Sequence, residues 1–208
     1  MNRNPRDIVR YRASERANHW IVAICFVLLA LSGLAFFHPA FFPLTQLFGG
    51  GPWTRILHPY IGVLMAVCFL VLALRFACAN LVRERDIQWL KQVPKLAADT
   101  NHPMPAQDKY NGGQKLLFWG LVIGMLAITV TGVLMWRAWW NLPVGVVRAA
   151  ALVHAIAAVW MIGLIILHVY AAIWTKGTMR AMVRGTVTRA WARHHHLLWF
   201  RRVTGEQD

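Results

Sequence analysis

Histidine is the residue type whose placement in this 208-residue chain could do chemistry. Nine histidines are present, and four of them lie in or at the edge of long apolar stretches: His19, His58, His154 and His168. A neutral imidazole nitrogen is a good ligand for a transition metal, and it can also relay protons. Polar groups inside a membrane are costly and usually functional, so the set indicates a metal or cofactor site or a proton path. Each histidine taken singly also fits a plain hydrogen bond between helices.

The elements that must position these histidines are four apolar stretches, residues 20–37, 56–74, 116–136 and 149–175. A bilayer core about 30 Å thick is crossed by about 20 helical residues, so each stretch is long enough to span it. Hydrophobic residues make up 58% of the chain and charged residues only 14%. We therefore predict an all-α integral membrane protein, a bundle of four transmembrane helices forming one domain over residues 1–208, with tails at 1–18 and 176–208.

The distribution of basic residues predicts the orientation of this bundle. Of the 22 Lys and Arg residues, 18 lie in the two tails and in the middle loop region, and Arg75 is near the same end of its span. Only Arg55, Arg137 and Arg148 lie on the opposite side. The positive-inside rule then places both termini and the middle loop in the cytoplasm. The formal charge of +14 is thus a topology signal, and we expect membrane lipid, not nucleic acid, around the chain.

The four histidines fall at two depths of the predicted bundle. His154 and His168 are 14 residues apart on one helix, which is about 21 Å along the axis and within about 40° of the same face. His58 begins its span at the outer edge, and His19 begins its span at the inner edge. Depth therefore pairs His58 with His154 and His19 with His168. Two stacked pairs of imidazoles on facing helices are what two b-type haems need.

Two other kinds of site compete for the same histidines. A zinc site needs three or four converging ligands, often with cysteine or carboxylate help, and the four stretches hold no Asp or Glu. A non-redox anchor or transporter could use the histidines as relay groups, although transporters more often carry a charged residue on their pathway. The chain has no Cys-x-x-Cys-His motif, so any haem would be held non-covalently.

The polar segments are also expected to hold helices. In the C-terminal tail, apolar residues between 179 and 191 recur at helical spacing with arginines between them. This pattern predicts a cytoplasmic amphipathic helix lying on the membrane surface. Residues 86–96 predict a shorter helix broken at Pro94, and residues 97–113 predict a loop. The roles of His194, His195 and His196 stay open at this level.

Several motifs, in the same order over essentially the whole chain, resemble the membrane cytochrome b (gamma) subunit of respiratory formate dehydrogenase. They are Ile-Val-Arg-Tyr (8–11), Glu-Arg-Ala-Asn-His-Trp (15–20), Leu-Ser-Gly-Leu (31–34), Arg-Ile-Leu-His-Pro (55–59), Lys-Tyr-Asn-Gly-Gly-Gln-Lys (109–115), Val-Thr-Gly-Val (130–133), Trp-Thr-Lys-Gly-Thr (174–178) and Ala-Trp-Ala-Arg-His-His-His (190–196). The plan of four helices and two haems alone would also fit the cytochrome b of membrane-bound nickel–iron hydrogenases.

The resemblance implies an electron-transfer subunit in a bacterial inner membrane. Its partners would be an iron–sulfur beta subunit and, through it, an alpha subunit holding molybdenum or tungsten, so this chain itself would hold no formate-oxidising site. His58 and His154 would bind an outer haem b, and His19 and His168 an inner one, which is the pairing that depth gives. A quinone would be reduced on the cytoplasmic side.

The resemblance also implies a quinone pocket formed by Asn111, Gly113 and Gln114 beside His168. Side-chain amides and a backbone N–H are suitable donors to quinone oxygens as these gain negative charge. From the residues alone, the same stretch favours a turn that caps the third transmembrane helix.

Overall fold

The computed structural model describes residues 7–99, 102–136 and 140–206. Arg3, Arg6 and Arg137, which enter the charge count above, lie outside the described residues. The chain divides into two compact units. The bundle unit comprises Ala17–Leu74 and Gly120–Leu167, and the polar unit comprises Met1–Arg16, Arg75–Trp119 and His168–Asp208.

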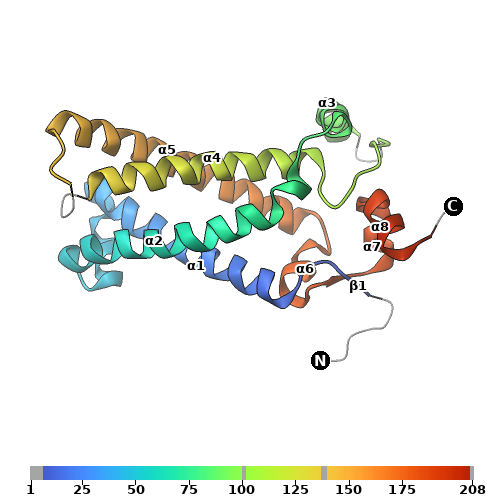
Figure 1. Ribbon diagram of the computed structural model, residues 1–208, viewed down its shortest axis with the longest axis horizontal. Coiled ribbons are helices and arrows are strands. Elements are labelled where there is room, and N and C mark those ends of the chain that lie inside the picture. The colour runs from blue at the N-terminus through green and yellow to red at the C-terminus, as the bar shows by residue number, and fades with distance from the viewer. Residues whose placement is uncertain (1–6, 100–101, 137–139, 207–208) are drawn as a thin grey trace. The chain divides into compact units, whose positions relative to one another are not determined.

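Four long helices confirm the four predicted spans: α1 (Ala13–Phe37), α2 (Gly51–Phe76), α4 (Gly112–Met135) and α5 (Val144–Trp174). They contain 25, 26, 24 and 31 residues, and each is long and apolar enough to cross a membrane. Within the bundle unit they lie side by side and successive helices run in opposite directions (Figure 1). At about 1.5 Å per residue, α5 exceeds the thickness of a bilayer core, so its ends extend beyond the hydrocarbon.

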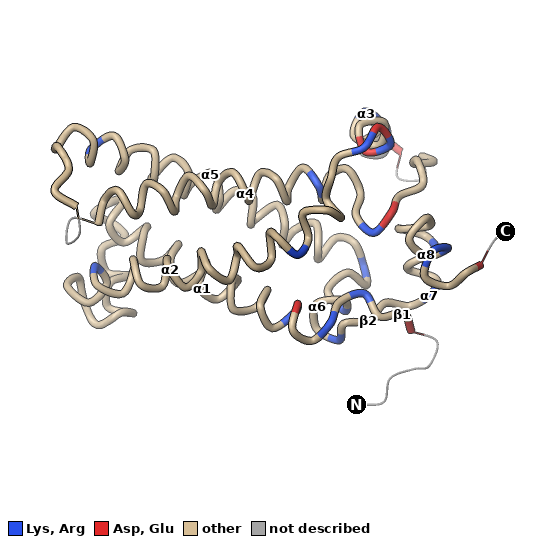
Figure 2. Tube along the Cα trace, in the orientation of Figure 1, with Lys and Arg blue, Asp and Glu red and all other residues tan. Residues whose placement is uncertain are grey.

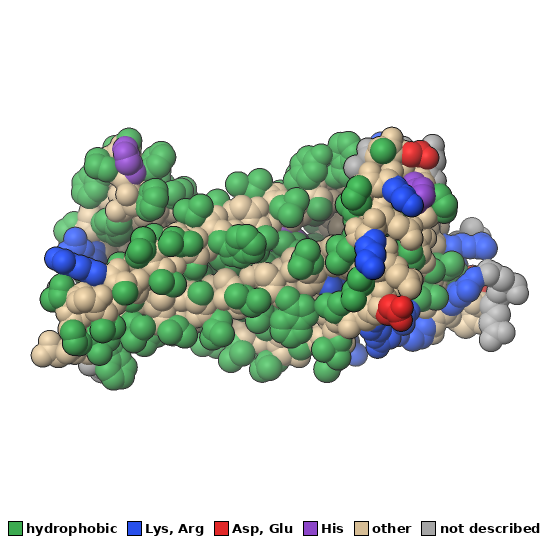
Figure 3. Space-filling view, turned by 90° about the horizontal axis from the view of Figure 1, so that it is seen from above, with side chains coloured by type: hydrophobic (Ala, Val, Ile, Leu, Met, Phe, Trp, Pro, Cys, Tyr) green, Lys and Arg blue, Asp and Glu red, His purple; other side chains and the backbone are tan. Residues whose placement is uncertain are grey.

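The bundle helices are apolar on their outward faces as well as on their inward faces. Large apolar side chains such as Leu126, Ile123 and Ile166 are each about two-thirds exposed, and Figure 3 shows hydrophobic side chains spread over the surface of the long helices. A soluble protein does not expose apolar surface on this scale, whereas a lipid-facing helix must.

The core of the bundle unit is a layer of sulfur-containing side chains, one from each long helix. Cys25, Met65, Met125 and Met161 are all buried and packed together. Gly124 of α4 lets α5 approach closely, because a Cβ atom there would lie 2.5 Å from the Met161 sulfur. Flexible methionine side chains fill irregular space well, so this layer closes the bundle without polar atoms.

Short 3-10 helices continue from the ends of the long helices. The segment η1 (Pro39–Phe48) begins at His38, whose side chain accepts a hydrogen bond from Ala40 N at 3.2 Å. It ends at Gly49, which has a left-handed backbone with φ 86° and leads into α2. A second short segment, η2 (Cys78–Asn80), follows α2.

The C-terminal tail corrects the prediction of one continuous amphipathic helix. It is helical, but it forms three short helices: α6 (Thr178–Arg184), α7 (Arg189–His195) and α8 (Leu197–Thr204). Gly185 ends α6 with φ 80°, and residues Thr186–Val187 form strand β2. This strand pairs antiparallel with β1 (Ile8–Val9) near the N-terminus. Val187 is buried in a small core with Ala181, Ala192, Trp199 and Phe200 instead of facing lipid.

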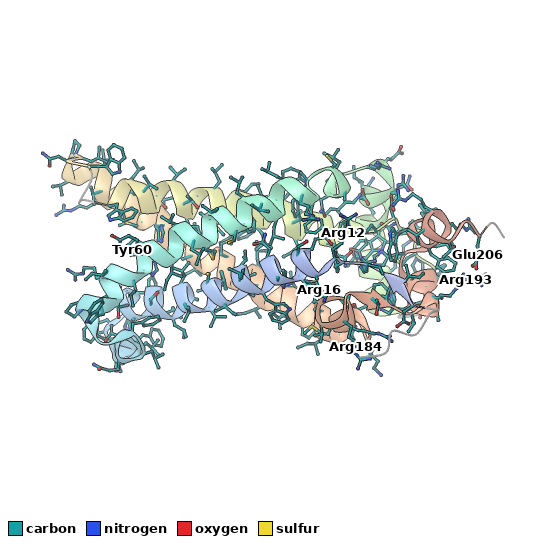
Figure 4. The ribbon with its side chains drawn as sticks, turned by 60° about the horizontal axis from the view of Figure 1, so that its bottom comes forward. Arg12, Arg16, Tyr60, Arg184, Arg193 and Glu206 are labelled. Carbon is teal, nitrogen blue, oxygen red and sulfur yellow. The ribbon has the colours of Figure 1, made fainter. Side chains whose placement is uncertain are left out.

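Gly185 shows why the continuous helix is impossible. A Cβ atom on this residue would overlap the Arg16 guanidinium and lie 2.7 Å from Tyr11 O. Arg16 itself donates to Tyr11 O at 3.2 Å. Figure 4 labels Arg16 at the start of α1 and Arg184 at the end of α6. The close approach of the N-terminal segment therefore needs glycine here, in a conformation that ends a helix.

Helix α3 (Glu84–Ala98) corrects a second prediction, because it continues through Pro94. Proline lacks the N–H that would bond the carbonyl four residues earlier, but its ring does not prevent the last turn from forming near a helix end. A capping box begins the helix, in which Arg83 N donates to the Asp86 carboxylate at 2.7 Å.

A buried arginine joins the separate segments of the polar unit. Arg10 is only 5% exposed. It donates to Lys109 O at 2.6 Å, and its guanidinium carbon lies 5.0 Å from the ring centroids of both Trp191 and Trp199. Cation–π contact with aromatic rings compensates part of the cost of removing the charge from water.

His196 completes this cluster as a neutral group. Its Nε2 lies 3.2 Å from Arg10 Nη2, and its Nδ1 lies 2.7 Å from Asp108 O. A carbonyl can only accept, so Nδ1 carries the proton and Nε2 accepts from Arg10. Burial, with a further contribution from the Arg10 charge, lowers the pKa of His196 to about 3. The sequence left the role of His196 open, and the structure places its side chain in the interior of the polar unit, where it is 2% exposed.

Nearly all the charge of the chain belongs to the polar unit. By sequence position, all 8 acidic residues and 19 of the 22 basic residues fall within its segments. Figure 2 marks in red and blue those of them that the structure describes. The bundle unit, with only three basic residues and no acidic ones in its segments, suits lipid, and the polar unit suits water.

Acidification should loosen the C-terminal tail. His196 titrates at its ordinary value of 6.5 when unfolded and near 3 when folded. The stability that its neutral form contributes is therefore complete above pH 6.5 and is lost as pH falls towards 3. Hydrogen exchange of α7 and α8, corrected for intrinsic rates, should show less protection at pH 5 than at pH 7. His196→Gln keeps a donor and an acceptor without titrating and should reduce the difference; an unchanged difference would contradict this account.

Candidate functional site

His58 of α2 and His154 of α5 lie close together inside the bundle unit. Their ring centroids are 6.4 Å apart, and the ring planes are inclined at 62°. A metal–imidazole bond is about 2.0–2.1 Å long and the ring centre lies about 1 Å behind the nitrogen, so two imidazoles that share one metal ion have centroids about 6 Å apart. The observed spacing therefore fits one metal atom between the two rings.

Each of these histidines is oriented by a hydroxyl group on a neighbouring helix. Ser32 Oγ of α1 lies 2.7 Å from His58 Nδ1, and Thr131 Oγ1 of α4 lies 2.9 Å from His154 Nδ1. Both hydroxyls donate their own proton to the backbone carbonyl four residues earlier, at 2.8 and 2.6 Å. Each hydroxyl then accepts from the ring, and the Ile128 carbonyl is a further acceptor for His154. Nδ1 is therefore protonated and the Nε2 lone pair is left to bind a metal.

Glycine follows each of the two hydroxyl residues. A Cβ atom on Gly33 would lie 3.6 Å from His58 Cε1, and one on Gly132 would lie 3.5 Å from His154 Cε1. The Cε1 atom, which lies between the two ring nitrogens, thus faces a glycine in each case. All four bundle helices contribute to this site, two with a histidine and two with a hydroxyl–glycine pair.

The other two predicted ligands belong to different units of the chain. His19 is in the bundle unit, and His168 is in the polar unit, both within long helices. Their pairing remains a prediction of the sequence. Met161 lies seven residues from both His154 and His168 along α5, which puts the methionine layer about 10 Å from each histidine along that helix.

The turn predicted to bind quinone forms a reciprocal capping box at the start of α4. Asn111 N donates to Gln114 Oε1 at 3.0 Å, and Gln114 N donates to Asn111 Oδ1 at 2.9 Å. The turn that the residues alone favoured is therefore present, and it starts the helix at Gly112 instead of Leu116. The box uses the two amide oxygens, and the amide NH2 groups take no part in it. They can still donate to a ligand.

Helix α3 packs onto this turn within the polar unit. A Cβ atom on Gly112 would lie 2.6 Å from Asp86 O, and one on Gly113 would lie 3.2 Å from the Trp89 ring. The Lys115 ammonium, just beyond the turn, bonds the Asp86 carboxylate at 2.7 Å. Both charges are almost fully buried, so this ion pair fixes α3 against the start of α4.

These observations define a membrane protein of four long helices with a paired-histidine site inside its bundle. Comparison with known proteins names the class. The chain belongs to the prokaryotic cytochrome b561 family, whose pattern matches residues 10–185. It is accordingly a bacterial membrane cytochrome b with a role in electron transfer, and a b-type haem is the cofactor of that family.

Curated relatives cover nearly the whole chain. The formate dehydrogenase cytochrome b556(fdo) subunit of Escherichia coli K12 is 44% identical over 198 residues, 94% of this chain and 93% of the relative. The nitrate-inducible formate dehydrogenase cytochrome b556(Fdn) subunit of the same organism is 40% identical over 94% of this chain and 91% of its own length. The formate dehydrogenase cytochrome b556 subunit of Haemophilus influenzae is 38% identical over 95% and 84%.

Sequence reasoning did not assign roles to Ser32 and Thr131. Both residues lie in motifs that carry the family resemblance, Leu-Ser-Gly-Leu and Val-Thr-Gly-Val. A hydroxyl followed by glycine, found twice in otherwise apolar spans, was the available signal. Which histidine each hydroxyl meets depends on helix packing, and packing cannot be read from either motif alone.

Filling the space beside the histidines should exclude the haem. Gly33→Leu and Gly132→Leu each place a branched side chain against a ligand imidazole, so haem content per purified chain should fall in both variants. Gly163→Leu is the matched control, because Gly163 is exposed on α5 and a Cβ there meets nothing within 4 Å. Equal haem content in all three variants would contradict the placement of the site.

Proposed function

We propose that this chain is the transmembrane electron-transfer subunit of a formate dehydrogenase. It passes electrons from an iron–sulfur subunit through two b haems to quinone at the cytoplasmic side, and it anchors the complex in the membrane. The family and the three formate dehydrogenase relatives support this proposal. The observation that carries it is the His58–His154 pair, whose 6.4 Å centroid spacing fits one shared iron.

The outer haem would be held by His58 and His154 through their Nε2 atoms. The haem supplies one-electron chemistry when it is bound, and the chain supplies two neutral imidazoles that keep the iron low-spin in both oxidation states. Ser32 and Thr131 hold these rings, and the surrounding apolar side chains exclude water. A dry, preorganised site needs little rearrangement when an electron arrives or leaves.

The inner haem would be held by His19 and His168. Their predicted depth on the cytoplasmic side and their places in family-like motifs support this assignment. Two haems in a stack would divide the thickness of the membrane into short steps for the electron.

Quinone would bind at the N-terminus of α4, beside His168. The amide NH2 groups of Asn111 and Gln114 are donors outside the capping box, and the first N–H groups of a helix, including that of Gly113, have no intrahelical acceptor. The positive end of the helix dipole favours the negative charge that develops on a reduced quinone. Protons for the quinone would come from the water that the polar unit faces.

Orientation follows from charge, with both termini in the cytoplasm and the His58–His154 site towards the outer side of the inner membrane. Four spans return the chain to the side on which it began, and the charged segments all belong to the polar unit. An iron–sulfur subunit, and through it a molybdenum or tungsten subunit, would deliver electrons from outside. Inward electron movement with proton uptake at the inner side would generate a membrane potential.

Replacing single histidines should remove one haem at a time. His154→Ala removes one ligand of the outer haem, so a pyridine haemochrome assay should fall from two haems per chain to one. His168→Ala should likewise remove only the inner haem. His38→Ala is the control and should keep both haems, since His38 caps η1 and its ring contacts Phe41 within the same segment. Loss of neither haem in His154→Ala would contradict the pairing.

Removing the amide donors should slow quinone reduction and leave the haems in place. Asn111→Asp and Gln114→Glu keep the oxygen acceptors of the capping box but lose the NH2 groups, so α4 should still form. Reoxidation of the reduced haems by quinone should slow by about tenfold or more. Gln88→Glu, an exposed position on α3, controls for the added charge. Normal reoxidation in both turn variants, or loss of a haem, would show that quinone binds elsewhere.

A further inference from the structure

We propose that Ser32 and Thr131 are positioning residues that set the relative angle of the two imidazole planes at the outer haem, and with it the electronic character of that haem. This inference rests on the proposed function, because it concerns the haem that His58 and His154 would bind. It goes beyond that function by assigning a task to two residues that bind no ligand themselves.

The same local arrangement of a hydroxyl residue, a glycine and a histidine occurs twice in the bundle unit. On α1 and on α4, a hydroxyl side chain is followed directly by glycine, and each hydroxyl contacts Nδ1 of a different histidine. Ser32 is 1% exposed and Thr131 is 7% exposed. Each hydroxyl is also tied to its own helix backbone, so its oxygen has a fixed direction.

The two fixed hydroxyl oxygens determine the planes of the His58 and His154 rings. An imidazole bound to iron through Nε2 can still rotate about the metal–nitrogen bond. A hydrogen bond from Nδ1–H to an oxygen that does not move stops this rotation. Because Ser32 and Thr131 stand on different helices, they hold the rings at different angles, and the observed inclination of 62° is the result.

The angle between the two imidazole planes affects the d orbitals of an iron bound between them. Parallel imidazole planes interact with the same iron d orbital and separate it in energy from its partner, which gives a ferric spectrum with three well-spread g values. Steeply inclined planes act on both orbitals and leave them nearly equal, which gives a strongly anisotropic low-spin signal with one large g value. With the His58 and His154 rings inclined at 62°, a haem bound between them would belong to the second class.

The same hydrogen bonds act on the reduction potential. An acceptor at Nδ1–H makes the imidazole a stronger electron donor and stabilises ferric iron. Loss of either hydroxyl should therefore raise the midpoint potential of the outer haem. Retention of both properties in Thr131→Ser, which loses the methyl group but keeps the hydroxyl, separates the hydrogen bond from packing.

The test is electron paramagnetic resonance of the purified full chain, combined with a redox titration of its visible spectrum. Thr131→Val replaces the hydroxyl with a methyl of the same size, and Ser32→Ala removes the other hydroxyl. In each variant the large-g signal of the outer haem should move towards smaller g, and its potential should become more positive. Thr131→Ser retains the hydroxyl and should keep the wild-type signal even if Thr131→Val binds less haem.

Thr129→Val is the matched control, because Thr129 lies on the same helix about 200° around from Thr131. If wild-type protein binds two haems and their signals do not change in Thr131→Val and Ser32→Ala, this inference is wrong and the proposed function stands. Thr131→Ser behaving as Thr131→Val would overturn it as well. Wild-type protein without haem would instead overturn the proposed function.

Discussion

An imidazole inside a lipid-facing bundle must find a partner for each of its two ring nitrogens, because no water is there to bond them. This constraint organises the bundle unit. His58 and His154 each give Nδ1–H to a hydroxyl on a neighbouring helix, and the hydroxyls in turn bond their own backbone. Nε2 is then the remaining polar atom of each ring, and the two rings stand at a distance that one iron atom fills. A haem iron between the rings would take the lone pairs that the Nδ1 hydrogen bonds leave on Nε2.

Most charged residues lie in the polar unit, apart from the His58–His154 site. The segments of the bundle unit contain no acidic residue and only three basic ones, whereas the polar unit contains the remaining charged residues and buries some of them. Arg10 is enclosed by aromatic rings, a carbonyl and the neutral His196, and Lys115 is paired with Asp86. These contacts connect the N-terminal segment, the middle loop and the C-terminal tail. The turn at Asn111, where we propose that quinone binds, is therefore held by segments that are far apart in the sequence.

The sequence was most informative where one local property decides the structure. Long charge-free stretches predicted the four spans, and histidine depth paired His58 with His154 before the structure brought them together. It was least informative where distant segments meet. The tail pattern predicted one helix, but strand pairing with the N-terminus and the approach of Arg16 to Gly185 divide it. Likewise, the sequence contains the motifs with Ser32 and Thr131, but it does not tell which histidine each hydroxyl contacts, because this depends on helix packing.

The proposed electron path requires that His58 and His154 ligate one low-spin iron, with a second bis-histidine haem in the same chain. Near-infrared magnetic circular dichroism of the oxidised, purified chain reads axial ligands directly, and a haem assay on the same sample gives their number. We expect two haems per chain, both with the charge-transfer band of paired neutral imidazoles. A single haem, or a band typical of histidine–methionine or high-spin ligation at the site that His154→Ala removes, would contradict it.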